Sequence, residues 1–129
     1  MTAVPDPGLT AVNRYRLLSD RAAFIAAVAA LAGRVKAEGH KGVLDYRFYC
    51  PEGAGEGRAV VRYRDAEAWV GHHDLAMAWP EMAAFRAVAA LDWVDLYGLV
   101  TPAMRDWIDR MGLGGKVGLM GASVAGFSR

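Results

Sequence analysis

The segments GVLDYRFYC (residues 42–50), PEGAGEG (51–57) and RAVVRYR (58–64) decide the fold of this chain. Apolar and polar residues alternate in the first and third segments, which is typical of β-strands with one buried face. The segment between them is rich in glycine, and its proline ends the first strand. Together they predict an antiparallel β-hairpin. The alternation places these side chains on one face of their strand: Leu44, Tyr46, Phe48 and Cys50 in the first, and Ala59, Val61 and Tyr63 in the second.

The residues before the hairpin predict a strand followed by a helix. Residues 11–18 alternate less regularly and predict a strand in which Asn13 and Tyr15 share a face. Ser19 is a suitable N-cap for the helix, because its hydroxyl can accept a hydrogen bond from a free backbone N–H, and Gly39 suits its end. The helix carries an apolar stripe typical of packing on a sheet. The stripe consists of Phe24, Val28, Leu31 and Val35.

The residues after the hairpin predict a second helical region and a fourth strand. Asp65 is a suitable N-cap for the helix. We expect an interruption near residues 73–74, where Asp74 can cap a new turn, and Pro80 fits the first position of the helix that follows. Residues 93–100 predict the fourth strand.

The order β-α-β-β-α-β predicts an α+β domain with a ferredoxin-like antiparallel sheet over residues 11–100. Residues 1–10 are expected to be a flexible leader. Residues 101–129 add a short amphipathic helix and a glycine-rich run, which is either an edge strand or an arm of the same domain. Both main helices lie on one side of such a sheet, so the other face needs a cover, and a symmetric homodimer provides one.

The composition excludes several classes of protein. The 129 residues suit one domain, and 15 basic against 14 acidic residues leave no positive excess for binding nucleic acid. Cys50 is the single cysteine, which fits a reducing cytoplasm. The first residues lack the features of a signal peptide, and the apolar run Ala22–Leu31 is too short to span a bilayer. We therefore expect a soluble, cytoplasmic protein that does not bind membranes.

The start of the second helical region carries the side chains that are most suited to catalysis or ligand binding. Trp69 and His72 are three residues apart and share a helical face, and His73 extends the same patch. Imidazole can move a proton near neutral pH, and an indole can line an aromatic pocket. The alternative is that Trp69 is a core residue and that the histidines are solvated. A metal site is not expected, because adjacent histidines point in different directions on a helix and no third ligand follows at a typical spacing.

Four other residues are candidates for ligand binding. Trp79 and Phe85 recur with Met82 at helical spacing, which is also the pattern of a core stripe. Arg86 could orient an acidic or phenolate ligand, or could be solvated. Asn13, an amide on a half-apolar strand, could bind a carbonyl or an oxyanion, or could pair with backbone.

The sequence resembles the antibiotic-biosynthesis-monooxygenase-like family of dimeric α+β barrels over residues 11–100. The resemblance rests on the order of elements and on two short motifs. Ala68–His72 is similar to the family's Ala-x-x-x-His signature, and Pro80–Phe85 is similar to its proline-then-phenylalanine segment. The family includes monooxygenases that oxidise polycyclic phenols without metal or flavin. Its haem-degrading members use an Asn, a Trp and a His; Asn13 and Trp69 match the first two, but Trp79 stands where the His is expected, which argues against haem degradation.

The resemblance implies a homodimeric, cofactor-independent monooxygenase that acts on a small aromatic, phenolic or quinol-type molecule. In this hypothesis His72 or His73 accepts a proton, and Asn13 and Arg86 position an oxygen atom. The substrate is held by an aromatic wall, which is formed by Trp69, Trp79 and Phe85. The alternatives are a non-catalytic dimeric barrel that binds a small ligand, and an isomerase or decarboxylase of similar fold.

Overall fold

The computed structural model describes residues 8–129. Of the leader predicted over residues 1–10, residues 1–7 lie outside the described part, and Leu9 and Thr10 already belong to the first strand. The described chain consists of β1 (Leu9–Leu17), α1 (Arg21–Glu38), β2 (Val43–Tyr49), β3 (Glu56–Tyr63), α2 (Ala66–Ala76), α3 (Pro80–Val88), β4 (Ala89–Tyr97), α4 (Pro102–Arg110), a 3₁₀ turn (Gly114–Lys116) and β5 (Val117–Gly121).

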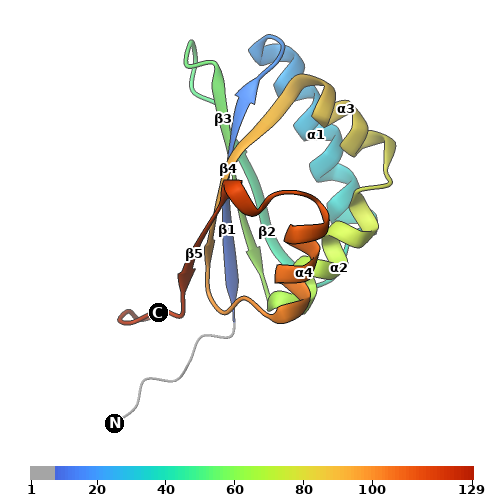
Figure 1. The fold of residues 1–129 in the computed structure, drawn as a ribbon. Helices are drawn as coiled ribbons and strands as arrows, with labels where there is room; N and C mark the ends of the chain where they lie inside the picture. Colours follow the sequence, from blue (N-terminus) through green and yellow to red (C-terminus); the bar gives the residue numbers. More distant parts are fainter. Residues whose placement is uncertain (1–7) are drawn as a thin grey trace.

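The strands form one sheet in the order β2-β3-β1-β4-β5. The first four pair antiparallel, and β5 joins the edge parallel to β4. The helices α1 to α4 all lie on one face of the sheet, and the other face is uncovered (Figure 1). This architecture confirms the predicted α+β, ferredoxin-like class. The glycine-rich run after α4 supplies an edge strand, one of its two predicted roles.

The helix boundaries follow from their capping residues, and two of them differ from the prediction. Asp20, not Ser19, caps α1: its carboxylate accepts a hydrogen bond from the N–H of Ala23. The second helical region is interrupted at residues 77–79, not at 73–74, and α3 begins with Pro80 at its first turn, as predicted. Asp74 remains inside α2, because its carboxylate accepts a hydrogen bond from the indole N–H of Trp107 instead of capping a turn.

Two strands also differ from the prediction. The pairing of β2 with β3 shifts between Val43 and Asp45, which indicates a bulge. Leu44 is consequently half-exposed, while Val43 packs against the core and Tyr46 and Phe48 face the helices. Strand β4 begins at Ala89, four residues before the predicted start, because α3 passes into it without a loop.

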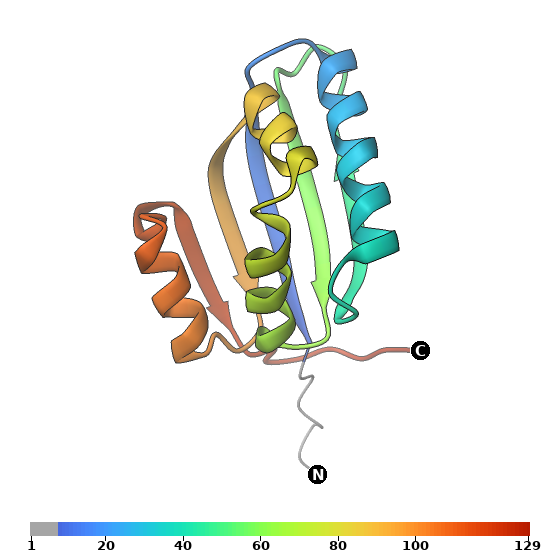
Figure 2. The same ribbon diagram turned by 90° about the vertical axis from the view of Figure 1, so that its right-hand side faces the viewer.

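The core lies between the sheet and the helices. The whole predicted stripe of α1 is buried, and so are Ala59, Val61 and Tyr63 of β3. Helix α1 lies over the β2 side of the sheet, while α2 and α3 follow each other over its centre and α4 lies on the β5 side (Figure 2). Among the described residues, none of the helices combines the length and the hydropathy that a membrane-spanning helix requires.

Candidate functional site

Five polar side chains meet in the layer between the sheet and the helices; we call them the tyrosine–histidine cluster. Strands β1, β2 and β3 contribute side chains that point toward the helices, and α2 contributes His72. The amide nitrogen of Asn13 donates to the hydroxyl of Tyr15 over 2.9 Å. The ring centroid of His72 lies 5.5 Å from that of Tyr46 and 5.9 Å from that of Tyr63. The members are Asn13, Tyr15, Tyr46, Tyr63 and His72.

Burial keeps the titratable members of the cluster uncharged. It raises the pKa of Tyr15 to about 12, and it raises the pKa of Tyr46 and of Tyr63 further. Negative charge on one tyrosine would raise the pKa of the next, so these hydroxyls share one electrostatic environment. Burial also lowers the pKa of His72 from 6.5 to about 3, with smaller contributions from the neighbouring His73 and His40. At neutral pH the site is therefore polar but without charge.

Two atoms of the cluster have unused hydrogen-bonding capacity. Among the described residues, Oδ1 of Asn13 and Nδ1 of His72 are the buried side-chain polar atoms without a hydrogen-bond partner. Leaving such an atom unpaired costs about 1–3 kcal/mol. A ligand hydroxyl that donates to either atom would recover part of this cost, so these two atoms are the natural polar contacts for a ligand.

Aromatic rings pack against the cluster. Phe85 of α3 meets Tyr15 edge to face, with ring centroids 4.9 Å apart, and its ring lies 5.6 Å from that of Phe48. Phe24 of α1 completes the group at 6.0 Å from Phe85. The structure thus brings three of the predicted site residues, Asn13, His72 and Phe85, to the same part of the interior.

His73 and Trp69 lie on the other side of α2, toward α4. Nδ1 of His73 donates to the carbonyl oxygen of Trp69 over 2.7 Å, which fixes the proton on that nitrogen. The His73 ring lies 4.1 Å from that of Trp69 and 5.0 Å from that of Trp107, and burial lowers the pKa of His73 to about 4. His73 is therefore held in an aromatic contact between two helices, although its ring is also within 5.0 Å of that of His72.

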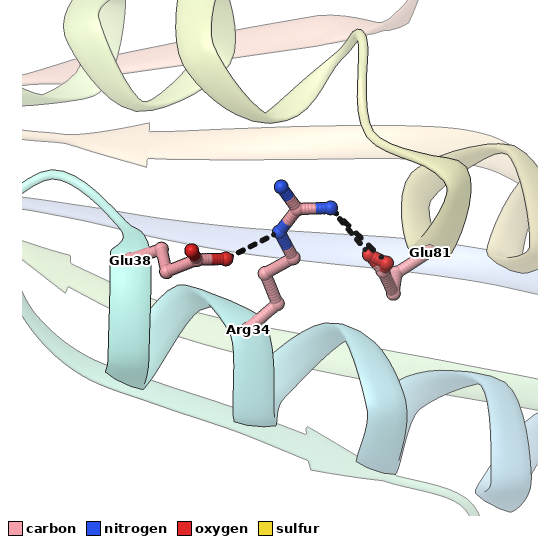
Figure 3. Close-up of polar contacts among 3 residues, drawn as sticks. All are labelled: Arg34, Glu38 and Glu81. Atoms are coloured by element: carbon pink, nitrogen blue, oxygen red, sulfur yellow. Dashed lines mark hydrogen bonds and ion pairs between the residues drawn. The ribbon is translucent and has the colours of Figure 1, made fainter.

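Trp79 and Arg86 lie apart from the cluster. Trp79 is the buried N-cap residue of α3, and the guanidinium of Arg34 lies 4.7 Å above its ring. Arg34 in turn binds Glu38 within α1 and Glu81 of α3, each over 2.8 Å, which fastens the two helices together (Figure 3). Arg86 is exposed on α3, where it donates to the sulfur of Met77 over 3.7 Å.

The sequence did not single out the three tyrosines of the cluster. Strand alternation does place Tyr15, Tyr46 and Tyr63 on the helix-facing sides of their strands. Their meeting depends on the strand order β2-β3-β1, which pairs Tyr46 with Val61 and Asn13 with Ala59. This spatial order, and not any local motif, is the missing signal.

Two neighbouring grooves open between α1 and β2, at the edge of the molecule. Their volumes are about 630 Å³ and about 310 Å³. Both are lined by Ala32 and Tyr46. Tyr46 thus contacts His72 on one side and the grooves on the other, so it connects the cluster with the surface. Within residues 8–129, no three His, Cys, Asp or Glu side chains are grouped so as to hold a metal ion.

Comparison with solved structures identifies the fold of this chain. The sequence matches no model of a protein family and no curated protein. Among solved structures, MupZ from Pseudomonas fluorescens is 18% identical and superposes with a TM-score of 0.75, over 100% of this chain and 94% of its own. SnoaB, a cofactor-independent oxygenase from Streptomyces nogalater, is 18% identical, with a TM-score of 0.57 over 74% of this chain and 95% of its own.

A candidate antibiotic biosynthesis monooxygenase from Caulobacter crescentus CB15 is 22% identical to this chain. It superposes with a TM-score of 0.54, over 71% of this chain and 88% of its own. The chain therefore has the ferredoxin-like α+β fold of the antibiotic-biosynthesis-monooxygenase-like proteins.

Proposed function

We propose that this protein is a cofactor-independent monooxygenase that acts on a small aromatic, phenolic or quinol-type molecule. One observation carries the proposal: the buried imidazole of His72 has an unpaired Nδ1 and packs against the rings of Tyr46 and Tyr63. The amide oxygen of Asn13, which is also unpaired, joins the same cluster through the hydrogen bond of Asn13 to Tyr15. This is an uncharged, aromatic environment with two polar contacts, which suits a planar phenol. The shared fold with a cofactor-independent oxygenase is consistent with this chemistry.

The proposed chemistry uses the substrate itself as the reductant of oxygen. An anthrone, for example, loses a proton to form an electron-rich enolate, which reacts directly with O₂. One oxygen atom then becomes the new carbonyl of the quinone, and the other leaves as water with the two hydrogens of the methylene. The protein has to bind the substrate, accept its proton and keep the site dry.

His72 is the proposed proton acceptor. Its low pKa in the free protein means that the imidazole is neutral and has a free lone pair. It becomes a stronger base only when an anion forms beside it, because opposite charges attract strongly in a buried site. Asn13 would accept a hydrogen bond from the substrate hydroxyl, and Phe85 would form part of the aromatic wall. His73 is less suited to the role, because its ring is packed between Trp69 and Trp107.

The test is oxygen uptake with a panel of anthrones and hydroquinones. We expect turnover by the wild type and a loss of kcat of about 10²- to 10⁴-fold in His72→Gln, which keeps a polar group but cannot accept the proton. Asn13→Ala provides a second variant if His72→Gln folds poorly, and Arg110→Gln on the exposed side of α4 is the matched control. Binding of panel compounds without oxygen uptake by the wild type would instead favour a non-catalytic ligand-binding barrel.

We propose further that the protein acts as a homodimer through the uncovered face of the sheet. Val12 and Val60 pair across β1 and β3 on that face, and Trp93 lies opposite Arg14 beside them; all three apolar side chains are half-buried. A second copy would cover them. Sedimentation should give a dimer for the wild type and a monomer for Val60→Glu. The control variant Leu75→Glu, at an exposed position of α2, should remain dimeric. A monomeric wild type would contradict the proposal.

A further inference from the structure

The larger groove between α1 and β2 combines an apolar floor with a positively charged rim. Val35, Val43 and Tyr46 supply apolar surface along its lining. Lys36 in the last turn of α1 and Lys41 in the following loop also line it. An apolar floor beside cations is the complement of an amphipathic anion.

The carboxylates near this rim are already paired with arginines. Asp45 binds Arg62 over 3.2 Å and Arg47 over 3.7 Å. Glu38 binds Arg34 over 2.8 Å. Among residues 8–129, by contrast, neither Lys36 nor Lys41 takes part in an ion pair. The two ammonium groups at the groove are therefore available to an external anion.

The groove leads toward the cluster through one residue. Tyr46 lines it, and the Tyr46 ring packs edge to face against His72 with centroids 5.5 Å apart. The smaller groove continues past Ala32 and Tyr46 along α1, where Phe24, Val28 and Phe48 provide apolar surface. A ligand held by its charge at Lys36 and Lys41 could thus lay its ring on Tyr46, next to the proposed proton acceptor.

We infer that this groove binds an aromatic carboxylate, with its anionic group at Lys36 and Lys41 and its ring on Tyr46. The inference rests on the proposed function, because it assigns the substrate of that site to the acidic members of its class. The charge of the ligand, and not only its aromatic body, then determines affinity.

The test compares naphthalene-2-carboxylate with the neutral 2-naphthamide, which has nearly the same shape. The full chain is labelled with ¹⁵N and titrated with each compound at low and high salt. We expect the acid to bind about tenfold more tightly than the amide at low salt, which is the magnitude of two partly exposed ion pairs, and we expect salt to reduce the difference. The backbone signals that shift should include those of Val35, Val43 and Tyr46.

The double variant Lys36→Gln/Lys41→Gln should bind the acid and the amide equally. Lys116→Gln is the matched control, since Lys116 lies away from the groove and donates to the carbonyl of Leu91. Equal affinity of the wild type for both compounds, or unchanged discrimination in the double variant, would overturn the inference.

The outcome is separable from that of the oxygenase test. Lysine-dependent binding of the acid without oxygen uptake on any substrate would refute the proposed function and support this site. Oxygen uptake by the wild type, together with binding of naphthalene-2-carboxylate that is insensitive to both lysines, would support the function and overturn this site.

Discussion

The two sides of the helical layer differ in how tightly they close over the sheet. Between α2 and α4, Trp69 and Trp107 meet edge to face with centroids 5.1 Å apart, and the His73 ring fills the space against them. At the edge between α1 and β2, two grooves remain open.

The adjacent histidines His72 and His73 lie toward these two different sides of the helical layer. His73 belongs to the packed side, where its ring packs against Trp107 of α4 and its Nδ1 hydrogen bond to Trp69 fixes the ring within α2. His72 faces Tyr46 and, through it, the open edge. The two imidazoles are adjacent in the chain, but one packs between α2 and α4 and the other is the proposed proton acceptor.

The largest effect is expected where the packing is densest. Trp107 is 3% exposed, and Trp107→Ala removes both its contact with Trp69 and its hydrogen bond to Asp74. We expect the free energy of unfolding to fall by about 3–5 kcal/mol, as for other large-to-small core changes. Urea denaturation measures it. Leu44→Ala, at the open edge and 50% exposed, should change it by less than about 0.5 kcal/mol. Similar losses in both variants would remove the contrast between the two sides.

The second effect depends on pH and tests the burial of His72. Its pKa is about 3 in the folded protein, below the ordinary value of 6.5, so the unfolded chain takes up the proton first as the pH falls. Above pH 6.5 the imidazole of His72 is neutral in both the folded and the unfolded chain, so it does not make the free energy of unfolding depend on pH. Between pH 6.5 and about 3 it lowers the free energy of unfolding by up to about 1.4 kcal/mol for each pH unit.

Urea denaturation at pH 7.5, 6.5, 5.8 and 5.0 should therefore show a shallower decline in His72→Gln than in the wild type. His73→Gln should also reduce the decline, because the pKa of His73 is lowered to about 4. Arg110→Gln, on the exposed side of α4, controls for the glutamine itself. An unchanged slope in His72→Gln would show that the imidazole is not held neutral by burial.

Much of the fold was predictable because short stretches of sequence show the hydrophobic periodicity of the helix or strand that they form. The stripe of α1 and the alternation of β3 each have the period of their element, and all of their predicted core residues are buried. The bulge at Leu44 was not predictable, because a one-residue shift in β2 is defined only against its partner β3. The start of β4 was also missed, since no turn residue separates it from α3.

The candidate site was predictable only in part, for the same physical reason. The spacing of Trp69, His72 and His73 is local, and it predicted one patch on a shared helical face. All three lie in α2, but Trp69 packs with His73 and His72 packs against Tyr46. That spacing could not tell which imidazole faces the sheet, because this depends on where α2 and α4 pack. The tyrosines of three separate strands come together only through long-range pairing.

The smallest expected effect is a gain in stability at the open edge. Gly33 lies inside α1, and a methyl group added there would meet no atom within 4 Å. Gly33→Ala should raise the free energy of unfolding by about 0.5–1 kcal/mol, because alanine restricts the unfolded chain and favours the helix. Ala30→Gly, at an exposed position one turn earlier, should lower it by a similar amount. At Gly57, under α1, an added methyl would instead lie 2.5 Å from the Phe24 ring. A loss of stability in Gly33→Ala would mean that α1 packs as closely at its groove side as it does against the sheet.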